Sequence, residues 1–241
     1  MKEHPRAIST DESGHLPNSR GGPGRSETAP GPAIRGFSLG PWQTNCYLVS
    51  DPHTRRCWII DPGFGPRGVI DSMQREGLIP EAIILTHSHV DHIGGIPDIH
   101  GQFPGLPIWI HRAEAQWLGN PLLNLSDGAG IRVTPPPPSR VLSDGETLEL
   151  ASQVWRVIHT PGHSPGGITL YHPPSGTALV GDTLFAGSIG RTDLPGGDFE
   201  TLAESIRRGL YTLPGTTRCL PGHGPETTID QERTTNPFVQ G

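Results

Sequence analysis

Apolar residues along this chain are grouped in short segments. Continuous apolar runs predict strands, and apolar residues spaced three or four positions apart predict helices. Two early runs, Asn45–Val49 and Cys57–Ile60, are rich in β-branched and aromatic residues, and an Asp-Pro pair that ends a strand follows each. The run Ala82–Leu85 is also typical of a strand. Between these runs, Pro66–Gly77 carries apolar residues at helical spacing and predicts an amphipathic helix.

The second half of the chain also contains predicted strands followed by a helix, but its sequence does not repeat that of the first half. Its β-type runs are Val154–Ile158, Ile168–Tyr171 and Ala178–Val180. Apolar residues then recur every three or four positions from Phe199 to Leu210, which predicts a helix with Asp198 as its N-cap. Strands followed by helices in both halves indicate two sheets covered by helices, that is, an α/β sandwich.

A change in composition near residue 32 divides the chain into an N-terminal tail and one domain. Residues 1–32 are rich in Ser, Gly, Pro and charged residues, and we expect a disordered tail because such a segment buries too little apolar surface. Residues 33–241 suffice for a single domain. The sequence contains no apolar stretch typical of a signal peptide or a membrane span, which favours a cytoplasmic protein without a membrane partner.

Cysteine usage and net charge narrow the function classes further. The three cysteines, Cys46, Cys57 and Cys219, are an odd number without CxxC spacing, so we expect small buried apolar residues rather than a disulfide framework or a thiolate zinc site. The net charge of −6 argues against nucleic acid as the main partner. A small-molecule substrate is the expected partner.

The segment Thr86–Gly95 carries the chemistry, because it contains an HxHxDH pattern directly after a predicted buried strand. On an extended segment, His87 and His89 point to the same side and can bind one ion. Asp91 and His92 follow where the chain turns toward a helix, and we expect Gly94-Gly95 to allow a tight turn. This displacement suits two adjacent ions. The alternative is a solvated polar loop, which does not account for the position after the strand.

One segment cannot complete two coordination shells, and three further candidates follow predicted strands. These are His163, Asp182 and His223, each with a neighbouring glycine that lets the backbone approach a crowded site. Imidazole and carboxylate ligands suit zinc, iron or manganese. The other histidines are interpreted as ordinary polar residues, and His159 is the one nearest to the site in sequence.

The order HxHxDH, then His, Asp and His, resembles the metallo-β-lactamase fold superfamily over about residues 34–225. This resemblance implies a four-layer αββα sandwich. It also implies a first metal held by His87, His89 and His163, a second held by Asp91, His92 and His223, and Asp182 as the bridge between them. By the same resemblance Asp61 supports the ligands from behind; a turn-capping role before Pro62 is the alternative.

Within this superfamily, residues 181–198 are similar to glyoxalase II, the hydroxyacylglutathione hydrolases, and particularly to short single-domain members. The ending Pro221–Thr228 supports the same branch. Arg191 stands where that family has a glutathione-contacting basic residue, although the aromatic pair that follows it there is replaced by Thr192-Asp193. A structural ion pair of Arg191 with Asp193 or Asp198 is the alternative.

The resemblance implies hydrolysis of a thioester such as S-lactoylglutathione with two divalent metal ions, zinc first and iron or manganese as alternatives. Two such ions share a water and lower its pKa from about 15.7 towards 7. Asp91 is the expected catalytic carboxylate, which orients this nucleophile and takes up its proton. A thiolate leaves without a general acid because thiol pKa values lie near 8.5.

Two rival functions are compatible with the sequence. Persulfide dioxygenases resemble this chain in the HxHxDH loop and in a Gly-Arg-Thr-Asp segment, and that resemblance implies a single iron at His87, His163 and Asp182. A non-catalytic metal-binding protein is the other rival, although each expected ligand position is filled. A β-lactam substrate is compatible with the fold, but no residue pattern in the sequence favours it.

Overall fold

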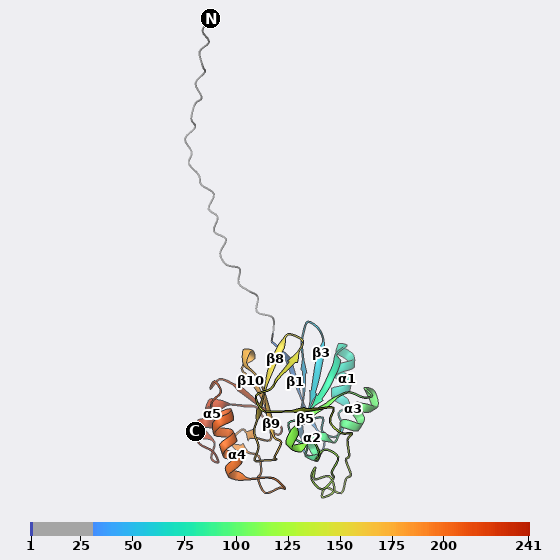
Figure 1. Cartoon of the computed structure of the whole chain (residues 1–241), viewed down its shortest axis with the longest axis vertical. Coiled ribbons are helices and arrows are strands. Elements are labelled where there is room, and N and C mark those ends of the chain that lie inside the picture. The colour runs from blue at the N-terminus through green and yellow to red at the C-terminus, as the bar shows by residue number, and fades with distance from the viewer. Residues whose placement is uncertain (2–30) are drawn as a thin grey trace.

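The computed structural model describes Met1 and residues 31–241 of the chain (Figure 1). The predicted tail, residues 1–32, lies almost wholly outside the described residues and stays a prediction. Among the described residues, no helix combines the length and the apolar character needed to cross a membrane. Localisation in the cytoplasm also stays a prediction.

Two six-stranded sheets form the body of the molecule. In the first sheet β1 to β6 lie in chain order, antiparallel up to β3 and parallel from β3 to β6. Its strands are β1 (Ala33–Leu39), β2 (Thr44–Ser50), β3 (Arg56–Ile60), β4 (Ile79–Ile84), β5 (Ile108–His111) and β6 (Arg140–Leu142).

The second sheet has the order β14-β13-β10-β9-β8-β7, and its β10–β13 pair is parallel while the other pairs are antiparallel. Its strands are β7 (Thr147–Leu150), β8 (Gln153–His159), β9 (Ile168–His172), β10 (Thr177–Gly181), β13 (Arg218–Pro221) and β14 (Thr227–Thr228). A small hairpin joins β11 (Leu184–Phe185) to β12 (Ser188–Ile189) beside this sheet.

Helices cover the outer face of each sheet (Figure 1). The first sheet carries α1 (Arg67–Glu76), α2 (Val90–Ile93) and α3 (Ile96–Gln102), and the second carries α4 (Phe199–Ser205) and α5 (Ile229–Thr235). Short helical turns are η1 (Arg112–Glu114), η2 (Pro173–Ser175) and the π-helical η3 (Ile206–Leu210), which continues α4. Asp198 caps α4 as expected, because its carboxylate accepts a hydrogen bond from the Thr201 amide.

The alternation of side chains along the strands produces the layers. In β3, Cys57 and Ile59 pack under the first-sheet helices, while Trp58 and Ile60 face the second sheet. A third apolar cluster lies between the second sheet and helices α4 and α5. The result is the four-layer αββα sandwich that the sequence predicts, and all three cysteines are buried in it.

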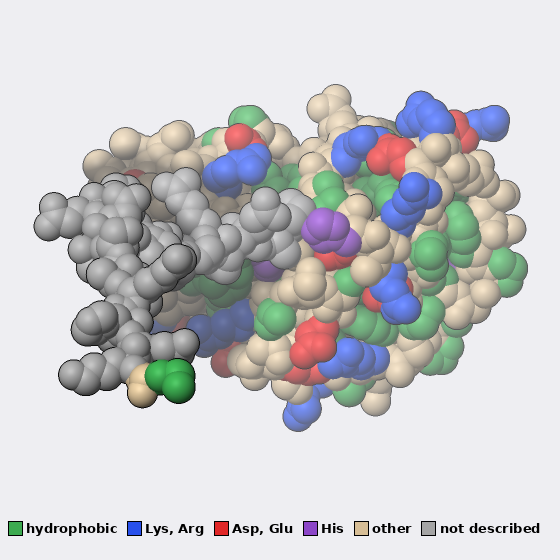
Figure 2. Space-filling view, turned by 90° about the horizontal axis from the view of Figure 1, so that it is seen from above, with side chains coloured by type: hydrophobic (Ala, Val, Ile, Leu, Met, Phe, Trp, Pro, Cys, Tyr) green, Lys and Arg blue, Asp and Glu red, His purple; other side chains and the backbone are tan. Residues whose placement is uncertain are grey.

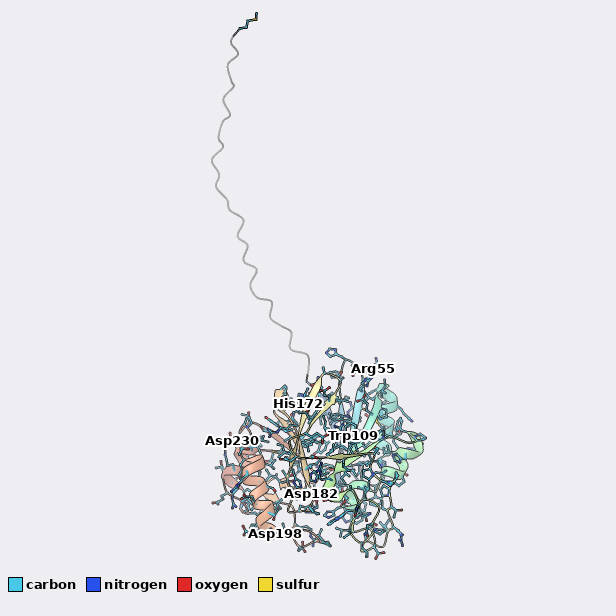
Figure 3. The ribbon with its side chains drawn as sticks, in the orientation of Figure 1. Arg55, Trp109, His172, Asp182, Asp198 and Asp230 are labelled. Atoms are coloured by element: carbon cyan, nitrogen blue, oxygen red, sulfur yellow. The ribbon has the colours of Figure 1, made fainter. Side chains whose placement is uncertain are left out.

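One end of the sandwich collects the loops that carry the candidate ligands. Asp182 lies at this end, between the sheets, whereas Arg55 and His172 lie at the opposite end (Figure 3). Figure 2 views the opposite end, where basic and acidic side chains of the described residues lie next to one another rather than forming a field of one sign. The chemistry is therefore concentrated at a single end of the fold.

Candidate metal centre

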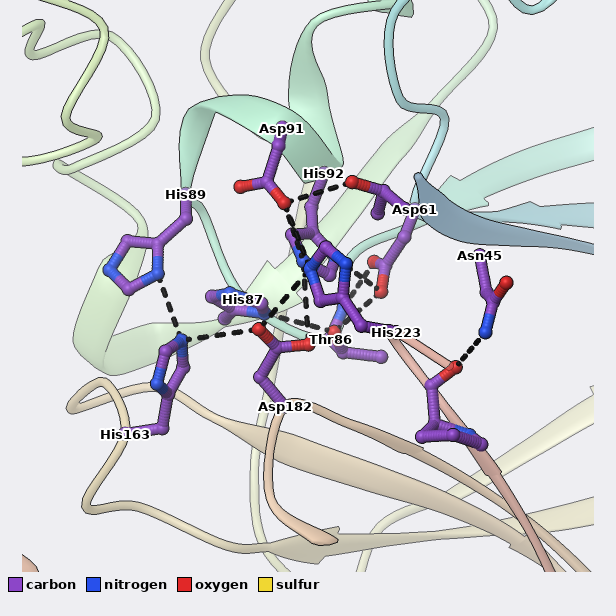
Figure 4. Close-up of polar contacts among 12 residues, drawn as sticks. Asn45, Asp61, Thr86, His87, His89, Asp91, His92, His163, Asp182 and His223 are labelled. Atoms are coloured by element: carbon purple, nitrogen blue, oxygen red, sulfur yellow. Dashed lines mark hydrogen bonds and ion pairs between the residues drawn. The ribbon is translucent and has the colours of Figure 1, made fainter. Parts of the chain in front are cut away.

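The loop after β4 places the first ligand candidates. His87 and His89 are buried with their ring centroids 4.7 Å apart, and His89 is the N-cap of α2 (Figure 4). Gly94-Gly95 form the turn between α2 and α3, as expected, with right-handed backbone angles. Close packing also requires glycine there: a Cβ at Gly94 would lie 2.4 Å from the Phe64 ring.

The other three candidates come from the second sheet. His163 lies in the β8–β9 loop, Asp182 follows β10 and His223 follows β13. The neighbouring glycines allow the close approach that the sequence predicts. Gly181 has a φ of +50°, and a Cβ at Gly222 would lie 2.1 Å from Oδ1 of Asp182.

Among the described residues, three groups of three potential ligands result; one of them, Asp61, His87 and His92, shares a histidine with each of the other two, the imidazole group and the mixed group. The imidazole group consists of His87, His89 and His163, and the mixed group consists of Asp91, His92 and His223. In each group, the three potential ligand atoms lie within 4.8 Å of one another. These are the two sets that the family resemblance implies, so the fold brings together side chains that are far apart in the chain.

Asp182 lies between the two groups (Figure 4). Its Oδ2 is 3.6 Å from Nε2 of His163 and 3.6 Å from Nε2 of His223. Its Oδ1 is 3.5 Å from Nε2 of His92 and has no hydrogen-bond partner among the described residues. A carboxylate in this position can bridge two cations.

Four of the five imidazoles are held by their Nδ1 atoms. The carbonyl oxygens of Arg191 and Trp42 accept from His163 and His223, at 2.8 and 3.1 Å. Asp61 accepts from His92 at 3.0 Å, and the Thr86 hydroxyl lies 3.1 Å from Nδ1 of His87. Because carbonyl and carboxylate oxygens only accept, Nδ1 of His92, His163 and His223 carries a proton, and Nε2 is the ring atom left to bind a metal.

Buried ring nitrogens without hydrogen-bond partners are an indication that the site is built for cations. Nε2 of His87 and of His92 is buried without a hydrogen-bond partner among the described residues. Buried polar atoms without partners are costly, and metal coordination satisfies them. Nδ1 of His89 faces Nε2 of His163 at 3.0 Å, a distance at which both atoms can bind one ion. The donor set of nitrogen and oxygen atoms fits zinc, iron or manganese.

The two groups differ in their electrostatics. Burial, with neighbouring imidazoles, lowers the pKa of His87 and lowers that of His89 to about 3. Burial also acts to lower the pKa of His92, but the charges of Asp91 and Asp182 outweigh it and raise that pKa well above its ordinary value. Burial is likewise outweighed at His223, because the hydrogen bond that its ring donates to the Asp91 carboxylate raises its pKa. The mixed group therefore binds protons more readily than the imidazole group.

Asp61 lies behind the ligand loop, where the family resemblance implies a supporting role. Its two carboxylate oxygens accept from the Thr86 amide at 2.7 Å, the Thr86 hydroxyl at 2.6 Å and Nδ1 of His92. Asp61 has a φ of 51°, a left-handed conformation that Asp tolerates better than most residues. Because its oxygens are occupied, Asp61 orients a ligand rather than acting as one.

A cleft of about 590 Å³ opens over the ligand candidates. Its other walls are mostly apolar and are formed by Trp42, Val90, Leu125, Ala129, Phe185, Ile189 and Leu194. Arg191 also lines it, but its Nε and Nη2 atoms donate to the Asp193 carboxylate at 2.7 Å each. Arg191 thus forms the structural ion pair that the sequence analysis gave as the alternative, with Asp193 as its partner. Among the described residues, no contact of Arg191 with Asp198 is found.

Sequence reasoning missed several residues that support the centre. The Thr44 hydroxyl donates to Oδ2 of Asp91 at 2.9 Å, and the Trp42 carbonyl orients His223. Glu114 binds two ligand-bearing loops. A Thr, a backbone carbonyl and a lone Glu carry no motif, so only their proximity in the fold identifies them.

Comparison with known proteins decides the family. The sequence profile of the metallo-beta-lactamase superfamily matches residues 39–223. The chain belongs to this superfamily. The match begins at the end of β1 and ends at His223, and it therefore includes each of the seven ligand candidates.

Similar superfamily members include two bacterial proteins. The chain is 40% identical to the probable metallo-hydrolase YqgX of Bacillus subtilis over 86% of this chain and 97% of that protein. It is 36% identical to the hydroxyacylglutathione hydrolase GloC of Haemophilus influenzae over 82% of this chain and 93% of that protein. The chain is thus a member of a superfamily branch that contains metallo-hydrolases.

Two solved structures of superfamily members share the fold. BLEG-1, described as a B3 metallo-beta-lactamase, is 39% identical with a TM-score of 0.81, over 87% of this chain and all of that chain. TTHA1623 in a di-iron-bound form is 39% identical with a TM-score of 0.76, over 86% of this chain and all of that chain. The second structure shows that a related site accepts iron, so the metal of this chain is not fixed by its superfamily.

Proposed function

We propose that this chain hydrolyses thioesters, and glutathione thioesters such as S-lactoylglutathione in particular. The observation that carries the proposal is the convergence of the seven side chains at one cleft, where Nε2 of His87, His89 and His92 and Oδ1 of Asp182 have no hydrogen-bond partner among the described residues. The identity with GloC supports a hydroxyacylglutathione substrate. In this proposal the ligands are His87, His89, Asp91, His92, His163, Asp182 and His223, and they hold two divalent metals, zinc first.

The bound metals would supply Lewis acidity and a water that is nucleophilic at neutral pH. Asp91 is proposed as the catalytic residue that positions this water. Its Oδ2 is held by Thr44 and lies 3.0 Å from Nε2 of His223, whereas no hydrogen bond reaches its Oδ1 among the described residues. Burial acts to raise the pKa of Asp91, but His92 outweighs it and keeps the carboxylate ionised. A free, ionised Oδ1 can accept the proton of an attacking water.

The leaving group favours a thioester over an amide. Apart from the proposed ligands, Arg191 is the only ionisable residue among the described residues that line the cleft. A guanidinium does not give up its proton. A thiolate departs unprotonated near neutral pH, whereas an amine nitrogen requires a proton donor. The cleft therefore suits a thiol leaving group.

Arg191 is proposed as a substrate contact at the rim of this cleft. Its guanidinium is 62% exposed and carries the one fixed positive charge of the lining. A glutathione carboxylate would have to compete with Asp193 for its donors. This competition makes the contribution of Arg191 to glutathione recognition small.

A β-lactam is a second candidate substrate, and the likeness to BLEG-1 is the observation that favours it. Opening a β-lactam ring produces an amine nitrogen that must be protonated. Because the cleft offers no separate proton donor among the described residues, we expect β-lactam turnover to be much slower than thioester turnover.

The first experiment measures metal content and three activities of the purified protein. We expect about two metals per chain, cleavage of S-lactoylglutathione, and a loss of at least about 100-fold in kcat for Asp91→Ala. Asp98→Ala, an exposed carboxylate on α3, is the matched control and should keep wild-type activity. About one iron per chain, with oxygen uptake on glutathione persulfide, would contradict the proposal. Faster turnover of a β-lactam than of any thioester would replace it.

A further inference from the structure

Glu114 is a buried carboxylate outside the proposed ligand set. It is the last residue of η1, the turn that follows β5, and its exposed fraction is 0%. It belongs to neither the imidazole group nor the mixed group. A buried carboxylate costs free energy unless its oxygens are hydrogen-bonded, so the partners of Glu114 indicate what it does.

Each oxygen of Glu114 accepts a hydrogen bond from a different ligand-bearing loop. Oε2 accepts from the backbone amide of Ser88 at 2.6 Å, and Oε1 accepts from that of Gly166 at 2.7 Å. Ser88 stands between His87 and His89, and Gly166 follows His163 by three residues. One carboxylate thus connects the two loops that carry the whole imidazole group, one from each sheet.

The peptide between Pro165 and Gly166 is held on both sides. Glu114 binds its amide, and Nε2–H of His159 donates to its carbonyl oxygen at 3.0 Å. The His159 ring stacks on His111, the last residue of β5, with ring centroids 4.0 Å apart. His111 and Glu114 lie at the two ends of one short turn, which therefore fixes this peptide against the first sheet.

The packing at Gly166 leaves the carboxylate no alternative position. A Cβ at Gly166 would lie 2.8 Å from Cγ and 3.0 Å from Cδ of Glu114. The side chain of Glu114 is thus enclosed between the two loops. We therefore expect a substitution of Glu114 or Gly166 to change the distance between the two loops that Glu114 connects.

We propose that Glu114 is a positioning residue that sets the spacing of the imidazole group and thereby the metal affinity of that group. The proposal rests on the two-metal centre of the proposed function. Because Ser88 lies between His87 and His89, and Gly166 lies in the loop of His163, we expect the effect of Glu114 to be larger on the imidazole group than on the mixed group, whose Asp91 and His92 lie further along the same loop. The mixed group is oriented by other residues, Asp61, Thr44 and Trp42.

The test is a stepwise zinc titration of Glu114→Gln against a chromophoric chelator. Gln offers one acceptor oxygen, and its NH₂ group faces one of the two amide donors. We expect the affinity of the imidazole group to fall on the order of tenfold or more while the affinity of the mixed group falls less. The absorption spectrum of the cobalt-substituted protein should also change, a readout that a loss of stability alone does not move.

Glu232→Gln is the matched control. Glu232 is equally buried and accepts from the Gly187 amide at 2.9 Å, but it contacts no ligand-bearing loop. Its variant should keep both zinc affinities and the cobalt spectrum. Gly166→Ala is the second test variant, because it displaces the Glu114 side chain without removing its charge, and it should weaken the same group.

Wild-type zinc affinity at both groups in Glu114→Gln would overturn the proposal. If that variant does not fold, wild-type affinity at both groups in Gly166→Ala would overturn it. The proposed function fails separately: a wild-type protein that binds two metals but cleaves no thioester disproves the thioester activity and leaves the role of Glu114 intact.

Discussion

The imidazole group and the mixed group each take two ligands from the same six-residue segment, yet they present opposite environments. The imidazole group has three buried rings and no carboxylate. The mixed group contains Asp91, and the side chain of His223 is 29% exposed. Burial keeps the pKa of His87 and His89 low, whereas carboxylates raise the pKa of His92 and His223.

This difference shows how one motif can serve two tasks. Neutral imidazoles with free lone pairs can bind a cation without first releasing protons. In the mixed group a metal competes with protons that Asp91 and Asp182 stabilise on His92. Metal binding to His87 and His89 therefore displaces no proton, whereas metal binding to the mixed group must displace protons from His92 and His223.

Asp182→Asn should lower the metal affinity of both groups. Asp182 is within 3.6 Å of Nε2 of His163 and of His223, and the neutral amide cannot bridge two cations equally well. We expect both metal affinities to fall and thioester turnover to drop more than about 100-fold, beyond the usual effect of a supporting residue. Elemental analysis and steady-state kinetics measure this. Loss of a single metal would show that Asp182 is not a bridge.

Asp61→Asn should weaken zinc binding mainly at the mixed group, whereas Glu114→Gln should weaken it mainly at the imidazole group. The amide can no longer accept from both Thr86 and Nδ1 of His92 with two oxygens. We expect the mixed group to lose about 10- to 100-fold in zinc affinity, and the imidazole group to lose less. The stepwise zinc titration applies here too. An equal loss in both groups would indicate that Asp61 supports the whole loop instead.

Lowering the pH should release metal from the mixed group before it releases metal from the imidazole group. The pKa values of His92 and His223 are raised, so these rings hold protons up to a higher pH and metal binding must displace them. Each displaced proton lowers the affinity about tenfold per pH unit below that pKa. His87 and His89, with lowered pKa values, stay neutral over the same range. Dialysis across a pH series with metal analysis should therefore show the mixed group losing its metal first; simultaneous release would contradict this.

Arg191→Ala, at the rim of the cleft, should have the smallest effect. The guanidinium is exposed and already paired with Asp193, and such surface pairs contribute at most about 1 kcal/mol. We expect KM for S-lactoylglutathione to rise less than about fivefold, with kcat unchanged. Asp193→Ala should lower KM, because it frees the guanidinium for substrate. No change of KM in either variant would exclude Arg191 as a substrate contact.

The parts of the fold that the sequence predicts are those with a local signal. The Asp-Pro pairs end β2 and β3 where expected, and the alternation in β3 separates the two core layers. The HxHxDH pattern places its side chains by spacing alone, because an extended segment followed by a helix has little freedom. The two-residue strands β11, β12 and β14 are not predicted, since two residues show no reliable periodicity.

The missed features depend on contacts between segments that are distant in the chain. Nothing near Glu114 in sequence indicates that it meets Ser88 and Gly166. The partner of Arg191 was open for a related reason, because Asp193 and Asp198 are both within reach of a long side chain and only the backbone of the loop decides between them. Residues without a motif of their own are identified only once the two sheets have assembled.

The origin of the ligands in both sheets has a consequence for how the protein matures. His87 belongs to the first sheet, and His223 follows one of the last strands of the second. During synthesis the N-terminal segments leave the ribosome first, so the mixed group does not exist until almost the whole described chain has emerged. In the proposed function, metal binding to the mixed group would then be a late step of biogenesis. A metal bound there would also link the two sheets and stabilise the folded protein.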